Sequence, residues 1–273
     1  MNFAALLKSE FRKLTYARST WWLLAGAIAF ATLSTAVMPL ILDATTAQVN
    51  GVPAPSALMN PDLVDAMFGK AAAGYYFAMI LGAMILAGEF AKGTAIATFL
   101  AAPARQTVLF AKITVAAIVG LVLQIISATI AAAVGLVVLM GYKHADPHLS
   151  AFGDLAITAA ISGIVLALVG LAVGALVRNQ TVAIVSLLAW MFLIDPILTA
   201  VLGSLNNEGA KFLFTALISG MMDLHLSGTA ATSRNPLSSI EFFSPLVSVA
   251  LLVGYAVVLV GAALSTSLRR DID

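Results

Sequence analysis

The chain has 273 residues, of which 61% are hydrophobic and 10% are charged, and its formal net charge is +1. Soluble domains average about 45–50% apolar and about 25% charged residues, so this composition excludes a soluble globular protein and predicts an integral membrane protein. The sequence contains no basic tract that would bind nucleic acid and no cysteine, which excludes disulfides and cysteine-ligated metals.

Residues 1–19 are predicted to form an amphipathic helix that lies in the membrane interface. Apolar side chains recur there at spacings of three and four, at Phe3, Leu6, Leu7, Phe11 and Leu14. A cleaved signal peptide is the alternative, because a basic start precedes an apolar run. That run is too long and begins too late for a signal peptide.

Six apolar segments are long enough to cross a bilayer, for which a helix needs about 20 residues. They are residues 21–42, 71–88, 113–140, 154–177, 181–205 and 244–267. Residues 43–70 are polar and contain three prolines, so we expect a loop there. The predicted fold class is therefore an all-α integral membrane protein with six transmembrane helices in a single transmembrane domain, residues 1–273.

Six spans place both termini on the same side of the membrane, and the positive-inside rule identifies that side. The side of the termini carries ten basic residues: Lys8, Arg12, Lys13, Arg18, Lys92, Arg105, Lys112, Arg178, Arg269 and Arg270. The other side carries the remaining four of the 14: Lys70, Lys143, Lys211 and Arg234. This asymmetry predicts a multi-pass protein of the cytoplasmic membrane with both termini in the cytoplasm.

The segment from residue 88 to residue 112, between the second and third spans, is itself charged. It carries Glu89, Lys92, Arg105 and Lys112. Charges in the bilayer core cost several kcal/mol, so the segment is expected at the surface. Apolar positions recur there at helical spacing, at Ile96, Phe99, Leu100 and Pro103. A short surface helix over residues 92–103 is therefore predicted; a frayed helix end with a basic anchor is the alternative.

A second segment, residues 206–243, is polar at its edges but apolar between Phe212 and Leu226. That apolar run is too short to span the membrane. We expect a re-entrant or surface helix that closes the outer face of the bundle. A helix merely packed on that face is the alternative.

The sequence offers little support for enzymatic chemistry. It has no Gly-rich phosphate loop and no paired nucleophile and base, so neither an ATPase site nor an intramembrane enzyme is expected. Three histidines fall in outer loops, and His144, Asp146 and His148 are close in sequence. They lack the helical pairing typical of metal ligands, so no metal site is predicted.

Polar residues inside the spans are candidate pathway residues. Asp195 is an intramembrane carboxylate, which favours a functional role, and Pro196 beside it could kink the helix. The alternative is that the fifth helix ends early and Asp195 caps a second short helix near the outer surface. Gln124 is a second candidate, although interhelical hydrogen bonding explains such residues equally well. Small residues in the fourth span predict close helix packing, namely Gly163, Gly170 and Gly174.

The charged segment resembles the signature of ATP-binding-cassette permeases of the second export type. That signature runs Glu, Gly-Thr, a leucine, Pro followed by Arg, and a later Lys. The matching residues here are Glu89, Gly93, Thr94, Leu100, Pro103, Arg105 and Lys112. Residues 8–22 resemble the family's amphipathic N-terminal helix, with Glu10, Lys13 and Arg18 at familiar spacing, and residues 177–185 resemble its second cytoplasmic turn. Many members have a Ser before the Arg, which this chain lacks.

The resemblance implies a permease subunit that works with a separate cytosolic ATPase, which would bind ATP and Mg²⁺. Residues 92–103 would be the coupling helix, with docking charges at Glu89, Lys92 and Arg105 and a secondary contact at Arg178. A second permease copy would complete the pathway, with the first and fifth helices at the dimer interface. The cargo would be an amphipathic or hydrophobic compound, such as a drug, an antibiotic peptide or a lipid. The alternative is a non-transporting membrane subunit that anchors or senses.

Overall fold

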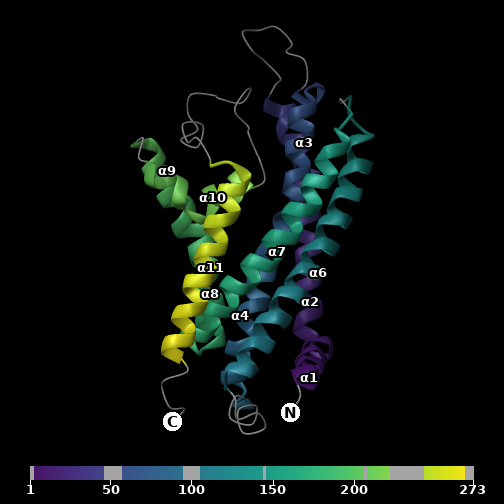
Figure 1. The fold of residues 1–273 in the computed structure, drawn as a ribbon. Helices are drawn as coiled ribbons and strands as arrows, with labels where there is room; N and C mark the ends of the chain where they lie inside the picture. The colour runs from purple at the N-terminus through teal and green to yellow at the C-terminus, as the bar shows by residue number, and fades with distance from the viewer. Residues whose placement is uncertain are drawn as a thin grey trace.

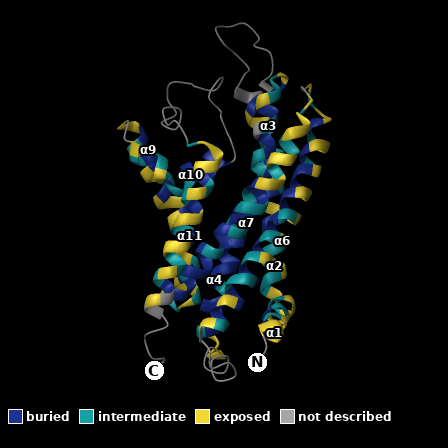
Figure 2. Ribbon diagram, in the orientation of Figure 1, coloured by how far each residue is buried: buried dark blue, intermediate teal, exposed yellow. Residues whose placement is uncertain are grey.

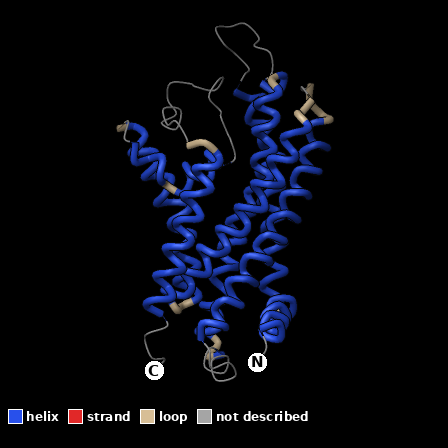
Figure 3. The backbone as a smooth tube through the Cα atoms, viewed as in Figure 1, coloured by secondary structure: helices blue, strands red, loops and turns tan. Residues whose placement is uncertain are grey.

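The computed structural model describes residues 3–45, 57–94, 105–143, 146–205, 208–221 and 243–267. Within these ranges the chain is helical apart from short turns, and it contains no strand (Figures 1 and 3). Six of the described helical stretches are long and apolar enough to cross a membrane. The protein is therefore an all-α, multi-pass membrane protein.

Helix α1 (Phe3–Tyr16) lies at one end of the bundle, and α2 (Arg18–Thr45) rises from the same end (Figure 1). The other elements follow in chain order, with η marking a 3₁₀ turn except at η3, a π turn: η1 (Ala57–Met59), α3 (Pro61–Gly69), η2 (Lys70–Gly74), α4 (Tyr75–Ala91), α6 (Arg105–Leu139), α7 (Leu149–Val177), α8 (Gln180–Ala189), η3 (Trp190–Ile194), α9 (Asp195–Ser204), η4 (Glu208–Phe212), α10 (Phe214–Met221) and α11 (Pro245–Ser267). The last turn of α11 lies at the same end of the bundle as α1.

The second span begins earlier than the sequence predicted. Residues 43–70 were expected to be a loop, but α3, η2 and α4 form one stretch of 31 residues from Pro61 to Ala91. Pro61 occupies the first helical position, where its missing N–H is not needed. The Asn60 side chain caps this helix by accepting the Asp62 N–H at 3.0 Å. The loop prediction is therefore wrong for the end of that segment.

Two other spans also start earlier than their apolar runs. Helix α6 begins at Arg105 rather than at residue 113, and α7 begins at Leu149 rather than at residue 154. Backbone hydrogen bonding continues a helix through polar residues that hydropathy assigns to a loop. The first, fifth and sixth spans agree with their predicted ranges within a few residues.

The core of the bundle is formed by α4 and α7 (Figure 2). In the most apolar window of the second span, 78% of residues are buried, compared with 22% for the spans formed by α2, by α8 to α9 and by α11. These outer helices expose large apolar side chains, including Trp22, Phe192 and Val258. In a membrane such faces contact lipid or another subunit.

Glycines allow α7 to approach its neighbours closely. Added Cβ atoms at three of them would collide with backbone oxygens: Gly163 at 2.6 Å from Gly120 O, Gly170 at 1.8 Å from Met79 O, and Gly174 at 2.5 Å from Ala83 O. Helix backbones in contact at this range leave no room for a side chain. The close packing predicted for these glycines is therefore confirmed.

The end of the bundle opposite α1 carries a polar contact between α3 and the start of α7. The His148 ring Nδ1 lies 2.6 Å from Asp65 Oδ2, and the His148 N–H donates to Asp65 Oδ1 at 3.0 Å. This hydrogen bond raises the pKa of His148. No cluster of three or more metal-ligating residues occurs among the described residues, and His144 lies outside them.

Replacing Gly170 with alanine is expected to destabilise the bundle by about 1–3 kcal/mol, because the added methyl group forces α4 and α7 apart. Gly254→Ala in α11 is the matched control, since nothing lies within 4 Å of its Cβ position. Thermal unfolding in detergent measures both. Equal transition temperatures for the two variants would contradict the close-contact geometry.

Candidate functional site

Four charged side chains form a closed ring of ion pairs at the end of the bundle that carries α1. Lys13 Nζ lies 2.6 Å from Glu10 Oε1 and 2.7 Å from Glu89 Oε1. Lys112 Nζ lies 2.8 Å from Glu10 Oε2 and 2.8 Å from Glu89 Oε1. Acid and base alternate around the ring, so its net charge is zero. We call these four residues the ion-pair ring.

The ion-pair ring joins three helices that are distant in sequence. Glu10 and Lys13 lie one turn apart on α1, Glu89 lies in the last turn of α4, and Lys112 lies near the start of α6. Glu89 and Lys112 lie at the two ends of the charged segment over residues 88–112, which is called the motif segment below. The ring therefore ties α1 to both ends of that segment.

Apolar packing holds α1 in place beside the ring. Leu6 contacts Val108 and Ala111 of α6, all three are buried, and Leu7 packs against them. Glu10 follows Leu6 by four residues, so both side chains lie on the same helical face. The Glu10–Lys112 ion pair therefore lies next to the apolar contact and joins the same two helices, α1 and α6.

Three of the four ring residues are largely removed from water, whereas 45% of the Lys13 side chain is exposed. Lys112 is fully buried, and Glu10 and Glu89 are 3% and 7% exposed. Burial raises the pKa of Glu10, but attraction and hydrogen bonding from Lys112 and then Lys13 outweigh it, so the pKa is lowered overall. Burial lowers the pKa of Lys13, but its bonds to Glu10 and Glu89 raise it overall. Both shifts favour the charged forms.

The motif segment begins with a sharp turn after α4. Lys92 ends the helix by donating its N–H to Gly88 O and Phe90 O, and Gly93 then adopts a φ of +66°, which favours glycine. The Thr94 hydroxyl lies 3.5 Å from Glu89 O. The positive φ at position 93 therefore explains why the motif has a glycine there.

The rest of the motif is described only in part. Leu100 and Pro103 lie outside the described residues, as does most of the predicted coupling helix over residues 92–103. Arg105 is the first residue of α6, but its side chain is not among those described. The roles predicted for these residues stay predictions.

Arg178 connects the second turn to the end of α4. It adopts a left-handed φ of 55° at the end of α7, and Asn179 then caps α8 by accepting the Val182 N–H at 3.2 Å. The Arg178 guanidinium lies 5.6 Å from the centre of the Phe90 ring, a cation–π contact. Arg178 therefore touches the residue that follows Glu89.

Asp195 lies within a continuous span, and its carboxylate caps another helix. It is fully buried just after the π turn η3. Its two oxygens accept the N–H groups of Phe214 at 3.0 Å and Thr215 at 2.7 Å, at the start of α10. A carboxylate at a helix N-terminus satisfies orphan donors and complements the helix dipole. The expected early end of the fifth helix is therefore wrong, because the span continues to Ser204, whereas Asp195 does cap a short helix. A pathway role for Asp195 stays a prediction.

Gln124 is buried in α6 and faces the 3₁₀ turn of the second span. Its amide nitrogen donates to Ala72 O, while its amide oxygen has no partner among the described residues. It therefore ties α6 to η2. A cavity of about 210 Å³ between α2, η2 and α10 is lined by neither Gln124 nor Asp195.

Sequence reasoning did not place Glu10, Lys13 and Lys112 in a common site. The available signal was Glu10, a carboxylate on the apolar face of an amphipathic helix. Such a position indicates a buried partner. The partner itself was not predictable, because Glu10 and Lys112 are 102 residues apart in the chain.

A comparison with models of known protein families finds none that matches this chain, and a search of curated proteins also finds no match. The resemblance to ATP-binding-cassette permeases therefore rests on the motif residues of the sequence alone.

Replacing Lys112 with methionine should destabilise the fold by about 3–5 kcal/mol, because two buried carboxylates then face a single lysine. The double variant Lys112→Met/Glu10→Gln should be more stable than Lys112→Met alone, since the remaining Lys13–Glu89 pair is neutral. Unfolding in detergent measures the set, with the exposed Lys143→Met as control. If the double variant lost as much stability as Lys112→Met and Glu10→Gln lose in sum, the four charges would not act as one energetic unit.

Proposed function

We propose that this protein is the membrane permease subunit of an ATP-driven export complex of the ATP-binding-cassette type. A separate cytosolic ATPase subunit would bind ATP and Mg²⁺ in this complex. The observation that supports the proposal best is the ion-pair ring, because it anchors both ends of the motif segment to one another and to α1. A segment held at both ends is suited to receive force from a partner.

The packing above the ring supports a mechanical role. Glu89 belongs to α4, which is buried along most of its length and contacts α7 through glycines. Close-packed helices move as rigid bodies rather than deforming gradually. In the proposed mechanism, closure of the ATPase pushes the segment after Gly93. The ring transmits that displacement to α1, α4 and α6 together.

Arg178 would provide a second point of force transfer. Its contact with Phe90 links the turn between α7 and α8 to the end of α4. An ATPase that touched both turns would therefore act on α4, α7 and α8 at once. Lys92, exposed beside this turn, is suited to dock an acidic partner surface.

The remaining parts of the proposal concern topology, assembly and cargo. The distribution of basic residues supports cytoplasmic termini, which would put the ring on the ATPase side. The exposed apolar faces of α2 and of α8 to α9 are compatible with pairing to a second copy. An amphipathic or hydrophobic cargo agrees with the low number of charges within the spans.

The direct test is a mild-detergent purification of the tagged chain from its own host, with partners identified by mass spectrometry. The proposal predicts an ATPase with a phosphate-binding loop in about one-to-one ratio. Reproducible absence of any ATPase from a folded sample would overturn the transport proposal. A non-transporting role in an ATPase complex would instead appear as a copurified ATPase that no compound stimulates.

In the purified complex, Glu89→Ala should reduce cargo-stimulated ATP turnover by about fivefold or more, because the ring loses its only contact with α4. Basal turnover by the ATPase should persist. Lys143→Ala, an exposed charge at the opposite end, is the control and should leave stimulation unchanged. Normal stimulation in Glu89→Ala would remove Glu89 from the coupling role.

A further inference from the structure

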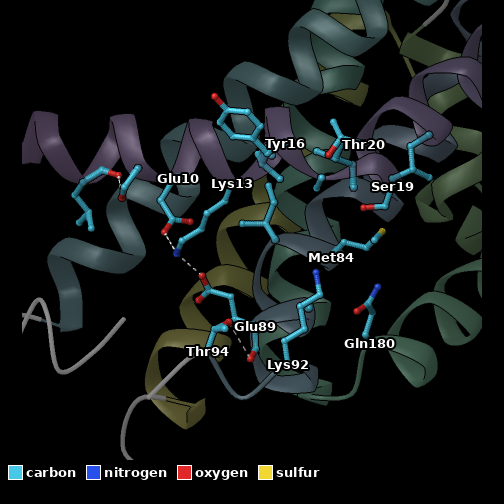
Figure 4. Close-up of a pocket in the computed structure, with 18 residues that line it drawn as sticks. Glu10, Lys13, Tyr16, Ser19, Thr20, Met84, Glu89, Lys92, Thr94 and Gln180 are labelled. Atoms are coloured by element: carbon cyan, nitrogen blue, oxygen red, sulfur yellow. Dashed lines mark hydrogen bonds and ion pairs between the residues drawn. The ribbon is translucent and has the colours of Figure 1, made fainter. Parts of the chain in front are cut away.

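Two cavities of the bundle differ in whether their charged residues are already paired. The larger, of about 640 Å³, lies beside the ion-pair ring, and Figure 4 shows Lys13 in it bonded to both Glu10 and Glu89. The smaller, of about 210 Å³, lies between α2, η2, the start of α4 and α10. Among the described residues, Lys70 is the only charged one that lines it. What this smaller cavity can bind therefore depends on whether Lys70 has a partner.

Within the described part of the chain, Lys70 is the one lysine that is partly buried and unpaired. Three lysines are paired with glutamates, namely Lys13, Lys112 and Lys211. Three others are exposed, namely Lys8, Lys92 and Lys143. The ammonium group of Lys70 forms no ion pair and no hydrogen bond with any residue that the structure describes. Partial burial of a charge without a replacement for water costs free energy, which an anion in the cavity would offset.

Helix α10 brings two hydroxyl groups to the same cavity. Thr215 and Ser219 both line it and are partly exposed, and their spacing of four residues places them on one face of α10. Neither hydroxyl is hydrogen-bonded within the described ranges, whereas the Ser34 hydroxyl on the α2 wall donates to Phe30 O at 2.8 Å. Asp195 holds Thr215 in place by accepting its backbone N–H at 2.7 Å. Lys70 and the two α10 hydroxyls therefore offer three donors to one anionic group.

Aromatic rings form another wall of this cavity. Phe30, Tyr75 and Tyr76 line it. The Phe30 and Tyr76 rings meet edge to face with their centres 5.6 Å apart, and the two tyrosine rings lie 4.3 Å apart. Tyr76 also stacks on Phe192 of η3, with 4.6 Å between the ring centres. Rings held by one another in this way present a preorganised surface to a further aromatic ring.

We propose that this cavity binds a small aromatic carboxylate. The carboxylate group pairs with Lys70 and accepts hydrogen bonds from Thr215 and Ser219, and the ligand's ring packs against Phe30 and Tyr76. One lysine balances the single charge of a carboxylate, whereas a phosphate dianion would retain an unpaired charge. Sites for drug-sized ligands occupy about 300–1,000 Å³, so a cavity of about 210 Å³ suits a smaller molecule. Binding involves this chain alone and does not depend on the proposed transport function.

Isothermal titration calorimetry on the purified full-length chain in detergent, with empty micelles as the blank, measures this binding. Phenylacetate should bind with a Kd of about 1 mM or tighter. Phenylacetamide, its neutral counterpart, should bind about tenfold more weakly, as expected for the loss of a charge-assisted hydrogen bond. Acetate and phenyl phosphate should also bind more weakly than phenylacetate. Absence of saturable phenylacetate binding, equal binding of phenylacetamide, or tighter binding of phenyl phosphate would each overturn the proposal.

Two variants locate the binding. Lys70→Gln should weaken phenylacetate binding about tenfold, whereas Lys143→Gln, which removes an exposed lysine, should leave it unchanged. Lys70→Gln should unfold at the same temperature as the parent or higher, because it removes an unpaired charge, so weaker binding would not reflect misfolding. Ser219→Leu fills the cavity without changing any charge and should prevent binding, and it decides alone if Lys70→Gln fails to fold. Undiminished binding of phenylacetate in either folded variant would refute the site.

Discussion

The burial of Lys112 is the constraint on which this end of the molecule depends. A fully buried ammonium group is tolerated only when opposite charges and hydrogen bonds replace water. Glu10 and Glu89 provide them, and the second carboxylate is balanced in turn by Lys13. Each of the three buried charges therefore depends on its oppositely charged neighbours in the ring. Helices α1, α4 and α6 are consequently held together by a single electrostatic unit.

This unit is continuous with the rest of the bundle. Helix α4 runs from the ring into the core, where glycines of α7 bring the backbones of the two helices into direct contact. At the other end, Asp195 fixes α10 against the span formed by α8 to α9. Polar contacts therefore secure both ends, while close backbone packing connects them. Such an arrangement favours rigid-body motion over local bending.

Much of the fold was predictable because hydropathy and helical periodicity report burial directly. The six spans, the amphipathic N-terminal segment and the α7 glycines were all visible in the sequence. The start of the second span was missed because three prolines and polar residues indicated a loop, although Pro61 and Asn60 initiate a helix. The partners of Glu10 and Asp195 were not predictable, since each contact joins distant segments. Hydropathy carries no information about such pairing.

The central claim is that the ion-pair ring holds α1 rigidly against the bundle. The chain has no cysteine, so cysteines introduced at the exposed positions Arg12 and Gln106 can carry spin labels on α1 and α6. Pulsed electron resonance should give a single narrow distance distribution, and Lys112→Met should broaden it. An equally narrow distribution in the Lys112→Met background would show that apolar contacts alone position α1, and would contradict the account.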